Sequence, residues 1–321
     1  MHRALVTGAT GTVGNLVARR LLADGIQVRA LVRAPGRAAA LLPAAVELAA
    51  GDVTDEASVR QAVAGCDTVF HVAGLPEQWL SDPGAFERVN LGGTRHLVAA
   101  SLAEGVRCFV HTSTIDALER SPGVPFDESR LASGRLGTAY QRSKLAADEH
   151  VTEAVLRDGL PARIVHPSAV YGPGTVGTTL NQVLLKLLRN QVPALPPGGL
   201  PVVYAPDVAE GHLLAAAAPV GSRYILSDQY LTLRRIAELV AAAAPGAKVP
   251  PTMPAPVAKA LAALGESAAR LLRRPPLLAS GELHFLLSHP LPDATRARTE
   301  LGWTTTPPAE AVPRTVQALL A

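Results

Sequence analysis

The sequence predicts an α/β fold in which a doubly wound parallel sheet carries a smaller, interleaved lobe towards the C-terminus. Short apolar runs alternate with helical patterns through the first half of the 321-residue chain, and a glycine-rich turn follows the first run. From about Pro173 the texture changes, because prolines and glycines cluster at 193–201 and again at 245–256. Such alternation of strands and helices is typical of a parallel sheet with helices on both faces.

The expected strands are short apolar segments, and the expected helices fill the intervals between them. The strands of the first half are 4–6, Gln27–Val32, Val46–Ala49, Thr68–Val72, Cys108–Thr112 and Ala162–Val165. The helices between them are Asn15–Ala23, Gly36–Leu42, Glu56–Val63, Phe86–Leu102 and Tyr140–Asp158. Later elements include helices over Leu180–Leu188 and Leu233–Ala244 and a strand over Arg223–Leu226. We therefore expect residues 1–172 to form the sheet domain, with 202–220 returning to it, and residues 173–321 to form mainly a substrate-binding lobe.

A glycine-rich turn between the first strand and the first helix predicts a phosphate cradle. Gly8, Gly11 and Gly14 are spaced Gly-x-x-Gly-x-x-Gly, which differs from the commoner Gly-x-Gly-x-x-Gly fingerprint. Glycine permits a tight turn and lets backbone N–H groups approach a pyrophosphate, which the positive end of the helix then faces. The alternative is a turn that merely contains three glycines. The other residues of the predicted cradle are Thr10, Thr12 and Val13.

Tyr140 and Lys144 lie four residues apart in one predicted helix and therefore share a face. A nearby cation favours the phenolate form, so such a tyrosine can exchange a proton near neutral pH. The alternative is an exposed Tyr and Lys on a surface helix. Together with a glycine cradle about 130 residues earlier, the pair predicts a nicotinamide-dependent redox enzyme.

Composition narrows the remaining function classes. The net charge is only +3 and no block of Lys and Arg is present, so we expect no nucleic-acid partner. Cys66 and Cys108 are the only cysteines, which excludes a disulfide scaffold and a cysteine-rich zinc site. Because the first expected strand begins almost at the first residue, we expect no signal peptide, and the sequence has no apolar run of membrane-spanning length. We expect a cytoplasmic protein with no membrane partner, and a homodimer is left open.

Taken in order along the chain, the motifs resemble those of the extended short-chain dehydrogenases/reductases, the NAD-dependent epimerase/dehydratase superfamily. The resemblance covers nearly the whole length and implies a Rossmann-type sheet. The further matching segments are Gly51–Asp55, His71–Gly74, Val89–Thr94, Thr112–Thr114, His166–Pro173, Asp207–Ala209 and Glu300–Trp303. Within the family, the chain is most similar to the dihydroflavonol-reductase-like and 3β-hydroxysteroid-dehydrogenase-like enzymes.

The resemblance also implies roles for individual residues. Thr114 matches the family's hydroxyl that binds the substrate oxygen, and its neighbour Ser113 is the alternative. Asn90 falls beside the substrate and the proton relay, although a buried Asn that fixes the backbone would explain it equally well. Asp52 resembles the carboxylate that reads the adenine amino group, with a helix cap or a loop turn as the alternative. The remaining implied contacts are Val53, Val72, Ala73, Gly74, Pro167 and Val170 with the cofactor, Lys144 with its ribose, and Tyr171 beside the nicotinamide or the substrate.

The end of the second strand bears on the choice of cofactor. Enzymes that use NAD place a carboxylate there, on the ribose 2′-hydroxyl. The segment Ala30–Arg37 contains no carboxylate, and Arg33 and Arg37 can instead pair with a 2′-phosphate. The alternative is a pair of ordinary surface arginines. NADP(H) is therefore favoured over NAD(H).

The substrate is the least determined feature. The segment 176–201 is rich in leucine, including Leu180, and has only Lys186 and Arg189 as charged residues, which favours an apolar carbonyl or alcohol over a sugar diphosphate. Trp79 could add an aromatic wall. The leading prediction is an NADP(H)-dependent reductase that uses hydride transfer. The alternatives are a nucleotide-sugar epimerase or dehydratase that retains NAD(P), and a non-catalytic NADP-sensing regulator, which would typically lack the Tyr-x-x-x-Lys pair.

The histidines at the strand ends raise the question of a metal site. His71, His111 and His166 recur there, but their flanks supply no coherent set of acidic or cysteine ligands. We expect them to pack or to line polar space, and we expect no metal.

Overall fold

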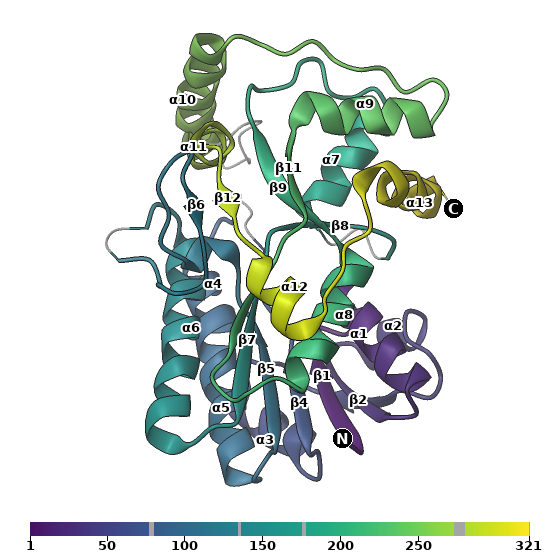
Figure 1. Cartoon of the computed structure of the whole chain (residues 1–321), viewed down its shortest axis with the longest axis vertical. Helices are drawn as coiled ribbons and strands as arrows, with labels where there is room; N and C mark the ends of the chain where they lie inside the picture. Colours follow the sequence, from purple (N-terminus) through teal and green to yellow (C-terminus); the bar gives the residue numbers. More distant parts are fainter. Residues whose placement is uncertain (77–79, 134–135, 175–177, 273–279, 321) are drawn as a thin grey trace.

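A seven-stranded parallel sheet forms the larger of two lobes. The computed structural model describes residues 1–76, 80–133, 136–174, 178–272 and 280–320. The strands run in the order β10, β7, β5, β4, β1, β2, β3, and every neighbouring pair is parallel. Their bounds are Arg3–Thr7 for β1, Gln27–Val32 for β2, Glu47–Ala50 for β3, Thr68–His71 for β4, Cys108–Thr112 for β5, Ala162–Pro167 for β7 and Arg223–Leu226 for β10. The predicted fold class is confirmed, and the fan of strands lies at the base of the molecule (Figure 1).

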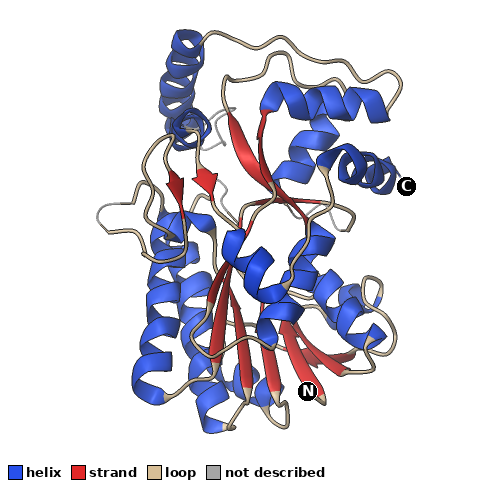
Figure 2. Cartoon of the chain, in the orientation of Figure 1, coloured by secondary structure: helices blue, strands red, loops and turns tan. Residues whose placement is uncertain are grey.

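Helices cover both faces of this sheet (Figure 2). Successive side chains of a strand point to opposite faces. Accordingly, Leu5 packs in a core with Leu97 and Val151, whereas its neighbour Val6 packs in another core with Val17. The first face carries α3 (Glu56–Val63), α5 (Gly93–Ala103) and α6 (Ala139–Asp158), and the second carries α1 (Thr12–Ala23), α2 (Pro35–Ala39) and α8 (Ala205–Ala216). Burial on both faces explains why the strands are continuously apolar.

The smaller lobe is built around a three-stranded sheet with the order β11, β9, β8. Its strands are β8 (Ala169–Tyr171), β9 (Gly199–Tyr204) and β11 (Gln229–Thr232). Its core includes residues from α7 (Thr179–Leu188), α9 (Leu233–Ala243) and α13 (Pro308–Leu320). Two further helices, α10 (Ala255–Leu272) and α11 (Ser280–Ser288), pack against each other above the large sheet. A short strand pair, β6 (Pro125–Phe126) with β12 (Leu291–Pro292), joins the lobes.

The C-terminal part of the chain returns to the large lobe more than once. The sequence pattern placed Arg223–Leu226 among the strands of the smaller lobe, but it pairs in parallel with β7 and extends the large sheet. The physical reason is burial, since Tyr224, Ile225 and Leu226 are fully enclosed, which suits a sheet covered on both sides. α12 (Thr295–Leu301) packs on β10, and the buried Trp303 donates from Nε1 to the carbonyl of Asp207 at 2.7 Å. By contrast, residues 202–204 belong to β9 of the smaller sheet.

One predicted helix is interrupted. In place of a continuous helix over Phe86–Leu102, the structure has α4 (Gly84–Phe86), a π-helical segment η1 (Glu87–Gly92) and then α5. A π turn adds a residue to the helical period without changing the apolar pattern, so periodicity cannot reveal it. π turns of this kind frequently occur at functional sites.

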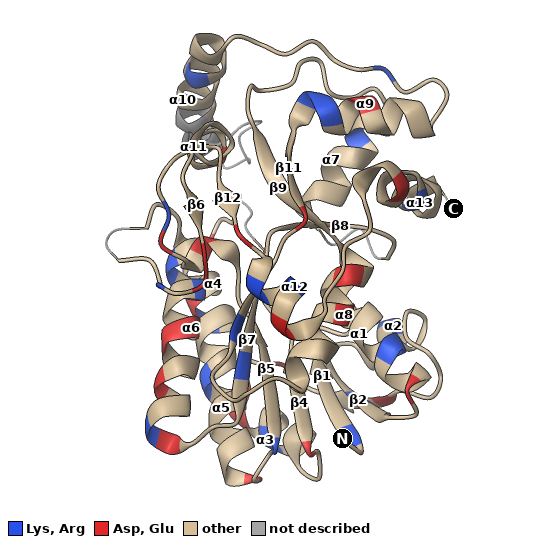
Figure 3. Ribbon diagram, viewed as in Figure 1, with Lys and Arg blue, Asp and Glu red and all other residues tan. Residues whose placement is uncertain are grey.

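Other boundaries differ by a few residues. α1 begins at Thr12, three residues before the predicted start, β4 ends at His71, and β7 continues to Pro167. Lys and Arg are scattered among Asp and Glu over both lobes (Figure 3). Within the described part of the chain, no helix combines the length and the apolar character that crossing a membrane requires.

Candidate active site

Close backbone approach shapes the loop between β1 and α1. Gly8 has a φ of +70°, and a Cβ at this position would lie 2.8 Å from the backbone nitrogen of Ala73. A Cβ on Gly14 would lie 2.3 Å from the carbonyl oxygen of Gly8. A side chain at either position would therefore force the loop apart. No side chain caps α1 at Gly11, so the helix start can accept an anion, and the cradle fits a pyrophosphate.

The rest of the predicted cradle surrounds this turn. Thr10 and Val13 are half-buried, whereas Thr12 is buried. Gly174, in the loop that follows β8, approaches Thr12, since a Cβ on Gly174 would lie 3.2 Å from Thr12 Cγ2. The smaller lobe thus reaches the start of α1.

Val72, Ala73 and Gly74 follow β4 and lie between the glycine loop and α6. Ala73 contacts Gly8, as described above. A Cβ on Gly74 would lie 3.2 Å from Asn90 Oδ1 and 4.0 Å from Lys144 Nζ. The structure therefore brings the glycine loop, Asn90 and Lys144 around one short segment.

The arginines at the end of β2 are exposed. Arg33 and Arg37 form no ion pair with a carboxylate of the described residues. Asp52, after β3, accepts hydrogen bonds at 2.9 Å from both the backbone N–H and the hydroxyl of Thr54, which is the geometry of a loop turn. Val53 packs beneath α5, since a Cβ on Gly93 would lie 2.9 Å from Val53 Cγ2.

Helix α6, which carries Tyr140 and Lys144, has a well-defined start. Thr138 and Gln141 form a reciprocal capping box, which holds the first turn in place. Tyr140 is half-buried in that turn, and its ring meets Phe86 edge-on with 6.0 Å between the centroids. Lys144, one turn later, is buried and donates from Nζ to the carbonyl of Thr112 at 2.5 Å. Burial lowers the pKa of Lys144 to about 8, and the Asp148 carboxylate opposes this lowering.

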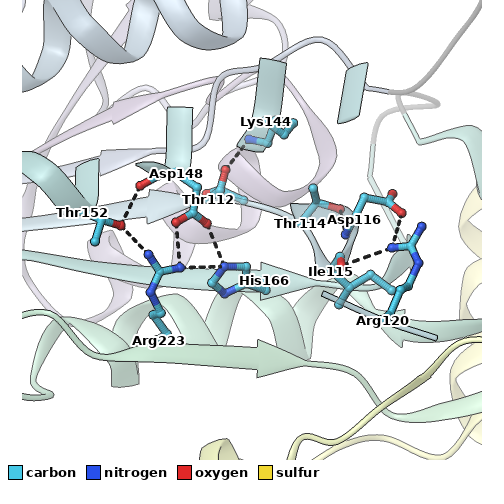
Figure 4. A network of polar contacts seen from close by, with 10 residues as sticks. All are labelled: Thr112, Thr114, Ile115, Asp116, Arg120, Lys144, Asp148, Thr152, His166 and Arg223. Carbon is cyan, nitrogen blue, oxygen red and sulfur yellow. Dashed lines mark hydrogen bonds and ion pairs between the residues drawn. The ribbon is translucent and has the colours of Figure 1, made fainter. Parts of the chain in front are cut away.

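Two hydroxyls follow β5 at the same end of the sheet. Thr114 Oγ1 accepts the N–H of Asp116 at 3.3 Å and caps the short 3₁₀ helix η2 (Ile115–Ala117). Its proton is not used in that contact, so the Thr114 hydroxyl can still donate to a substrate oxygen. Ser113 is buried, and its hydroxyl has no well-formed hydrogen bond to the described residues, although it helps to keep the pKa of Asp148 low. α6 packs against η2, so the helix that carries Tyr140 and Lys144 lies beside the turn that carries Thr114. Figure 4 shows Lys144 and Thr114 in this region.

A buried ionic network lies one turn behind Lys144 (Figure 4). Asp148 accepts a hydrogen bond from His166 Nε2 at 2.8 Å, and its other oxygen is 2.7 Å from Arg223 Nη1. Burial alone would raise the pKa of Asp148, but His166 and Arg223 outweigh it and hold that pKa well below its usual range. Arg223 comes from β10, so the late return of the chain completes the network.

The sequence reasoning missed Asp148, Arg223 and His212 as parts of the site. The only available signal for Asp148 was its position four residues after Lys144. His212 of α8 donates from Nδ1 to the carbonyl of Val208 at 2.7 Å, so its Nε2 accepts the hydroxyl of Thr112 at 2.8 Å. Thr112 is therefore held through its side chain while its carbonyl receives Lys144.

Asn90 is enclosed within the same region. Its Oδ1 accepts the N–H of Leu75 at 2.7 Å, and its Nδ2 donates to Ser143 Oγ at 3.0 Å. The Asn90 side chain thus connects the segment after Gly74 to α6 and helps to fix the backbone there.

The residues suggested as substrate contacts lie in different surroundings. Tyr171 and Leu180 are buried in the core of the smaller lobe, where Tyr171 stacks near Tyr204 with 5.9 Å between centroids. The Tyr171 hydroxyl has no hydrogen-bond partner among the described residues, and burial raises its pKa. Pro167 ends β7 and Val170 packs towards η2. Trp79 lies outside the described residues.

A family model described as "NAD dependent epimerase/dehydratase family" matches residues 4–226, which contain the glycine loop, Thr114, Tyr140 and Lys144. The chain belongs to the NAD dependent epimerase/dehydratase family. The predicted membership of the extended short-chain dehydrogenases/reductases is confirmed.

Curated relatives within the epimerase/dehydratase family include reductases. The chain is 36% identical over 278 residues to the "Putative dihydroflavonol 4-reductase" of Synechocystis sp., covering 82% of this chain and 80% of that protein. It is 33% identical over 307 residues to "Sterol demethylase protein B" of Methylococcus capsulatus, covering 93% and 92%. It is 31% identical over 246 residues to a 3 beta-hydroxysteroid dehydrogenase/Delta 5-->4-isomerase of Mycobacterium tuberculosis, covering 71% and 65%.

Solved structures show the same family fold. The crystal structure of gox2253 has a TM-score of 0.85 and 32% identity, and the match covers 100% of this chain and 98% of that chain. The UDP-glucose 4-epimerase of Thermus thermophilus in complex with NAD has a TM-score of 0.80 at 24% identity, covering 99% of each chain, and shows the likeness of fold.

Family membership implies a nicotinamide dinucleotide as cofactor. The residues present fit this group, because the cradle at Gly8 and Gly14 leaves room only for backbone and Lys144 lies beside the segment at Gly74. Among the described residues, no group of three or more His, Cys, Asp or Glu side chains could hold a metal ion.

Proposed function

We propose that this epimerase/dehydratase-family enzyme is an NADP(H)-dependent carbonyl reductase that interconverts a ketone or aldehyde and an alcohol on a fairly apolar small molecule. The observation that carries the proposal is that the helix with Tyr140 and Lys144 packs against the turn that Thr114 caps. Lys144 is bonded to the last residue of β5, two residues before Thr114, and α6 packs on the turn that Thr114 caps.

The proposed chemistry assigns a distinct task to each side chain. Thr114 donates its hydroxyl proton to the substrate oxygen and fixes its position. Tyr140 gives a proton to the same oxygen as the carbonyl becomes an alcohol. Lys144 places a buried positive charge one turn from Tyr140, which favours the phenolate that remains. When bound, NADPH would supply the hydride.

The cofactor preference rests on the end of β2. Arg33 and Arg37 are exposed there and are not paired with described carboxylates, so their guanidinium groups remain available to a 2′-phosphate. A carboxylate on the ribose, typical of NAD enzymes, is absent from this segment.

The substrate class is supported by charge rather than by the leucines of the smaller lobe. Leu180, Leu184 and Leu187 are buried in the lobe core and are not free to line a site. Arg120 lies near Thr114, but it pairs with Asp116 at 2.7 Å and stacks on Phe285 at 5.2 Å. This cation is therefore already engaged and is a poor ligand for a sugar diphosphate. Several relatives are named for ring-bearing or alkyl substrates, including steroids and 2-alkyl-3-oxoalkanoates.

A substrate panel tests the proposal. The purified protein is mixed with NADPH and, separately, a dihydroflavonol, a 3-ketosteroid, a 2-alkyl-3-oxoalkanoate, cinnamoyl-CoA, UDP-glucose and dTDP-glucose. We expect stoichiometric NADPH oxidation with at least one of the first four. Conversion of a sugar nucleotide without net NADPH consumption would favour an epimerase or dehydratase. NADPH binding without turnover of any compound would leave the regulator alternative.

A further inference from the structure

A chain of hydrogen bonds leads from the segment beside the glycine loop to the backbone carbonyl of Asn90, and the side chain of Asn90 continues it to α6. It begins where the N–H of Ala73 donates to Thr7 Oγ1 at 3.0 Å, and Thr7 Oγ1 lies 2.9 Å from His71 Nδ1. His71 Nε2 lies 3.0 Å from Thr94 Oγ1, which donates to the carbonyl of Asn90 at 2.5 Å. We infer that His71 is a positioning residue that couples the cofactor loop to the catalytic helix as a neutral imidazole protonated on Nε2.

The direction of each hydrogen bond follows from Thr94. A carbonyl oxygen can only accept, so the single hydroxyl proton of Thr94 goes to Asn90. Thr94 Oγ1 must then accept from His71, which places the imidazole proton on Nε2. Nδ1 is left as an acceptor for the hydroxyl proton of Thr7, whose oxygen in turn accepts the Ala73 N–H. In this arrangement each N–H and O–H group donates one hydrogen bond, and no two protons face each other.

The surroundings keep this imidazole neutral. His71 is buried, and burial together with the Lys144 charge lowers its pKa to about 3. The nearest other ring is that of His111, which is also buried, with 5.4 Å between centroids, and whose pKa burial also lowers. The protonation state of His71, and with it the direction of these hydrogen bonds, therefore does not change across the physiological pH range.

The chain continues from Asn90 to the catalytic tyrosine. The Leu75 N–H fixes Oδ1 as the acceptor of the Asn90 amide, so Nδ2 donates to Ser143 Oγ at 3.0 Å. Ser143 Oγ in turn donates a hydrogen bond to the backbone carbonyl of Tyr140 at 2.8 Å. The links therefore join the residue that touches Gly8 to the backbone of Tyr140.

This coupling matters because the reacting groups sit on separate elements. The dinucleotide loop follows β1, whereas Tyr140 and Lys144 belong to α6, and hydride and proton transfer require both in register. A misplacement of about 1 Å can cost on the order of 100-fold in rate. The hydrogen bonds hold the two elements together through His71, Thr94 and Ser143, to which the proposed mechanism assigns no chemical step.

The tautomer is tested directly by ¹⁵N NMR of the histidine rings in the full-length protein without ligand. We expect the His71 signals to show a protonated Nε2 and an unprotonated Nδ1, unchanged from pH 5.5 to pH 8.5. A protonated Nδ1, or titration in this range, would overturn the inference. This readout does not depend on the proposed reaction.

The kinetic test rests on the proposed carbonyl reduction and uses the panel ketone that the wild type reduces fastest. Thr94→Val removes the hydroxyl at nearly constant shape, and Thr94→Ser restores it. We expect kcat at saturating NADPH to fall about 30-fold or more in Thr94→Val and to recover to within about 3-fold in Thr94→Ser. Equal kcat values for the two variants would overturn the coupling.

His71→Leu is compared with His111→Leu in the same assay. The two histidines are paired in register on neighbouring strands, and both are buried, but the His111 nitrogens have no hydrogen-bond partner among the described residues. We expect a large loss of kcat only for His71→Leu. Similar losses in both would show that core packing, and not the chain, is responsible. If the wild type reduces no ketone, the proposed function fails while the NMR result still decides the tautomer.

Discussion

Lys144 donates from Nζ to the backbone carbonyl of Thr112, the last residue of β5, over 2.5 Å. This contact ties α6 to the strand that leads to Thr114. Because Thr112 is also held by His212 through its hydroxyl, the lysine is anchored to a carbonyl that cannot shift freely. The position of the cation is therefore set by three elements, α6, β5 and α8.

Arg33→Ala should weaken NADPH much more than NADH, since only NADPH carries the phosphate that the guanidinium would hold. Loss of this charge-assisted contact should cost about 1.5–3 kcal/mol of NADPH binding. Fluorescence titration of both cofactors checks this, with Arg60→Ala, an exposed arginine on α3, as the control. Equal weakening of both cofactors would mean that Arg33 only supports the adenine or the fold.

The rate of carbonyl reduction should fall as the pH rises through about 8. The pKa of Lys144 is lowered to about 8 by burial, so the ammonium that favours the Tyr140 phenolate is lost above that pH. A profile of kcat/KM against pH reports the free enzyme and checks this. A rate that stays level up to pH 9.5 would contradict the role given to Lys144.

Asp148→Asn should destabilise the fold by about 3–5 kcal/mol at pH 7, because Arg223, which is only 14% exposed, would lose its carboxylate partner. The pKa of Asp148 is held below its unfolded value, so its stabilisation is present above about pH 4 and is lost as the pH falls below it. Denaturant unfolding should show that the difference in free energy of unfolding between wild type and variant becomes smaller in acid. Glu149→Gln, exposed on the same helix, is the control and should show no such gap.

Glu128→Gln should stabilise the protein above pH 7. Both carboxylate oxygens of Glu128 are buried without a hydrogen-bond partner among the described residues, and burial raises its pKa to about 7. Because the pKa of Glu128 is higher in the folded than in the unfolded protein, folding is most favourable below about pH 4.5, where Glu128 is protonated in both states. This contribution to the free energy of unfolding is lost as the pH rises through 7. The amide removes this charge, so we expect a gain of about 1–3 kcal/mol at pH 8 and little change at pH 4.5. An unchanged unfolding midpoint at pH 8 would show that Glu128 is solvated in the native state.

Tyr140→Phe should abolish turnover while leaving NADPH binding intact. The ring and the capped start of α6 remain, so the loss should fall on proton transfer and amount to about 100-fold or more. Steady-state rates, together with a fluorescence titration of NADPH, measure both quantities. Near-wild-type turnover by the variant would remove Tyr140 from the mechanism.

Local patterns predicted the elements better than their partners. Glu56–Val63 has the observed bounds of α3, because an amphipathic helix begins at an Asp cap and ends within one stretch of sequence. The placement of Arg223–Leu226 beside β7 could not be predicted, because pairing depends on a partner about sixty residues away. The π turn at Asn90 could not be predicted for a related reason. Its side chain is held by contacts with Leu75 and Ser143, which are distant in sequence and leave no trace in the local apolar pattern.

The site shows the same division. Sequence motifs predicted the glycine loop, Tyr140 and Lys144, because each motif needs only a few residues at a short, fixed spacing. Asp148, Arg223 and His212 act through contacts between distant segments, and no local pattern indicated them. The family resemblance suggests Tyr171 as a substrate contact and the leucine-rich segment 176–201 suggests Leu180, but both side chains lie in the core of the smaller lobe.

Transfer of deuterium from NADPH labelled at C4 tests the central claim most directly. The labelled cofactor is incubated with the panel ketone that the wild type reduces fastest, and the product is examined by mass spectrometry. The account predicts an alcohol with one deuterium on the carbinol carbon, one NADP formed for each alcohol, and no product with Tyr140→Phe. An alcohol without deuterium, or a changed sugar nucleotide with no net oxidation of NADPH, would contradict it.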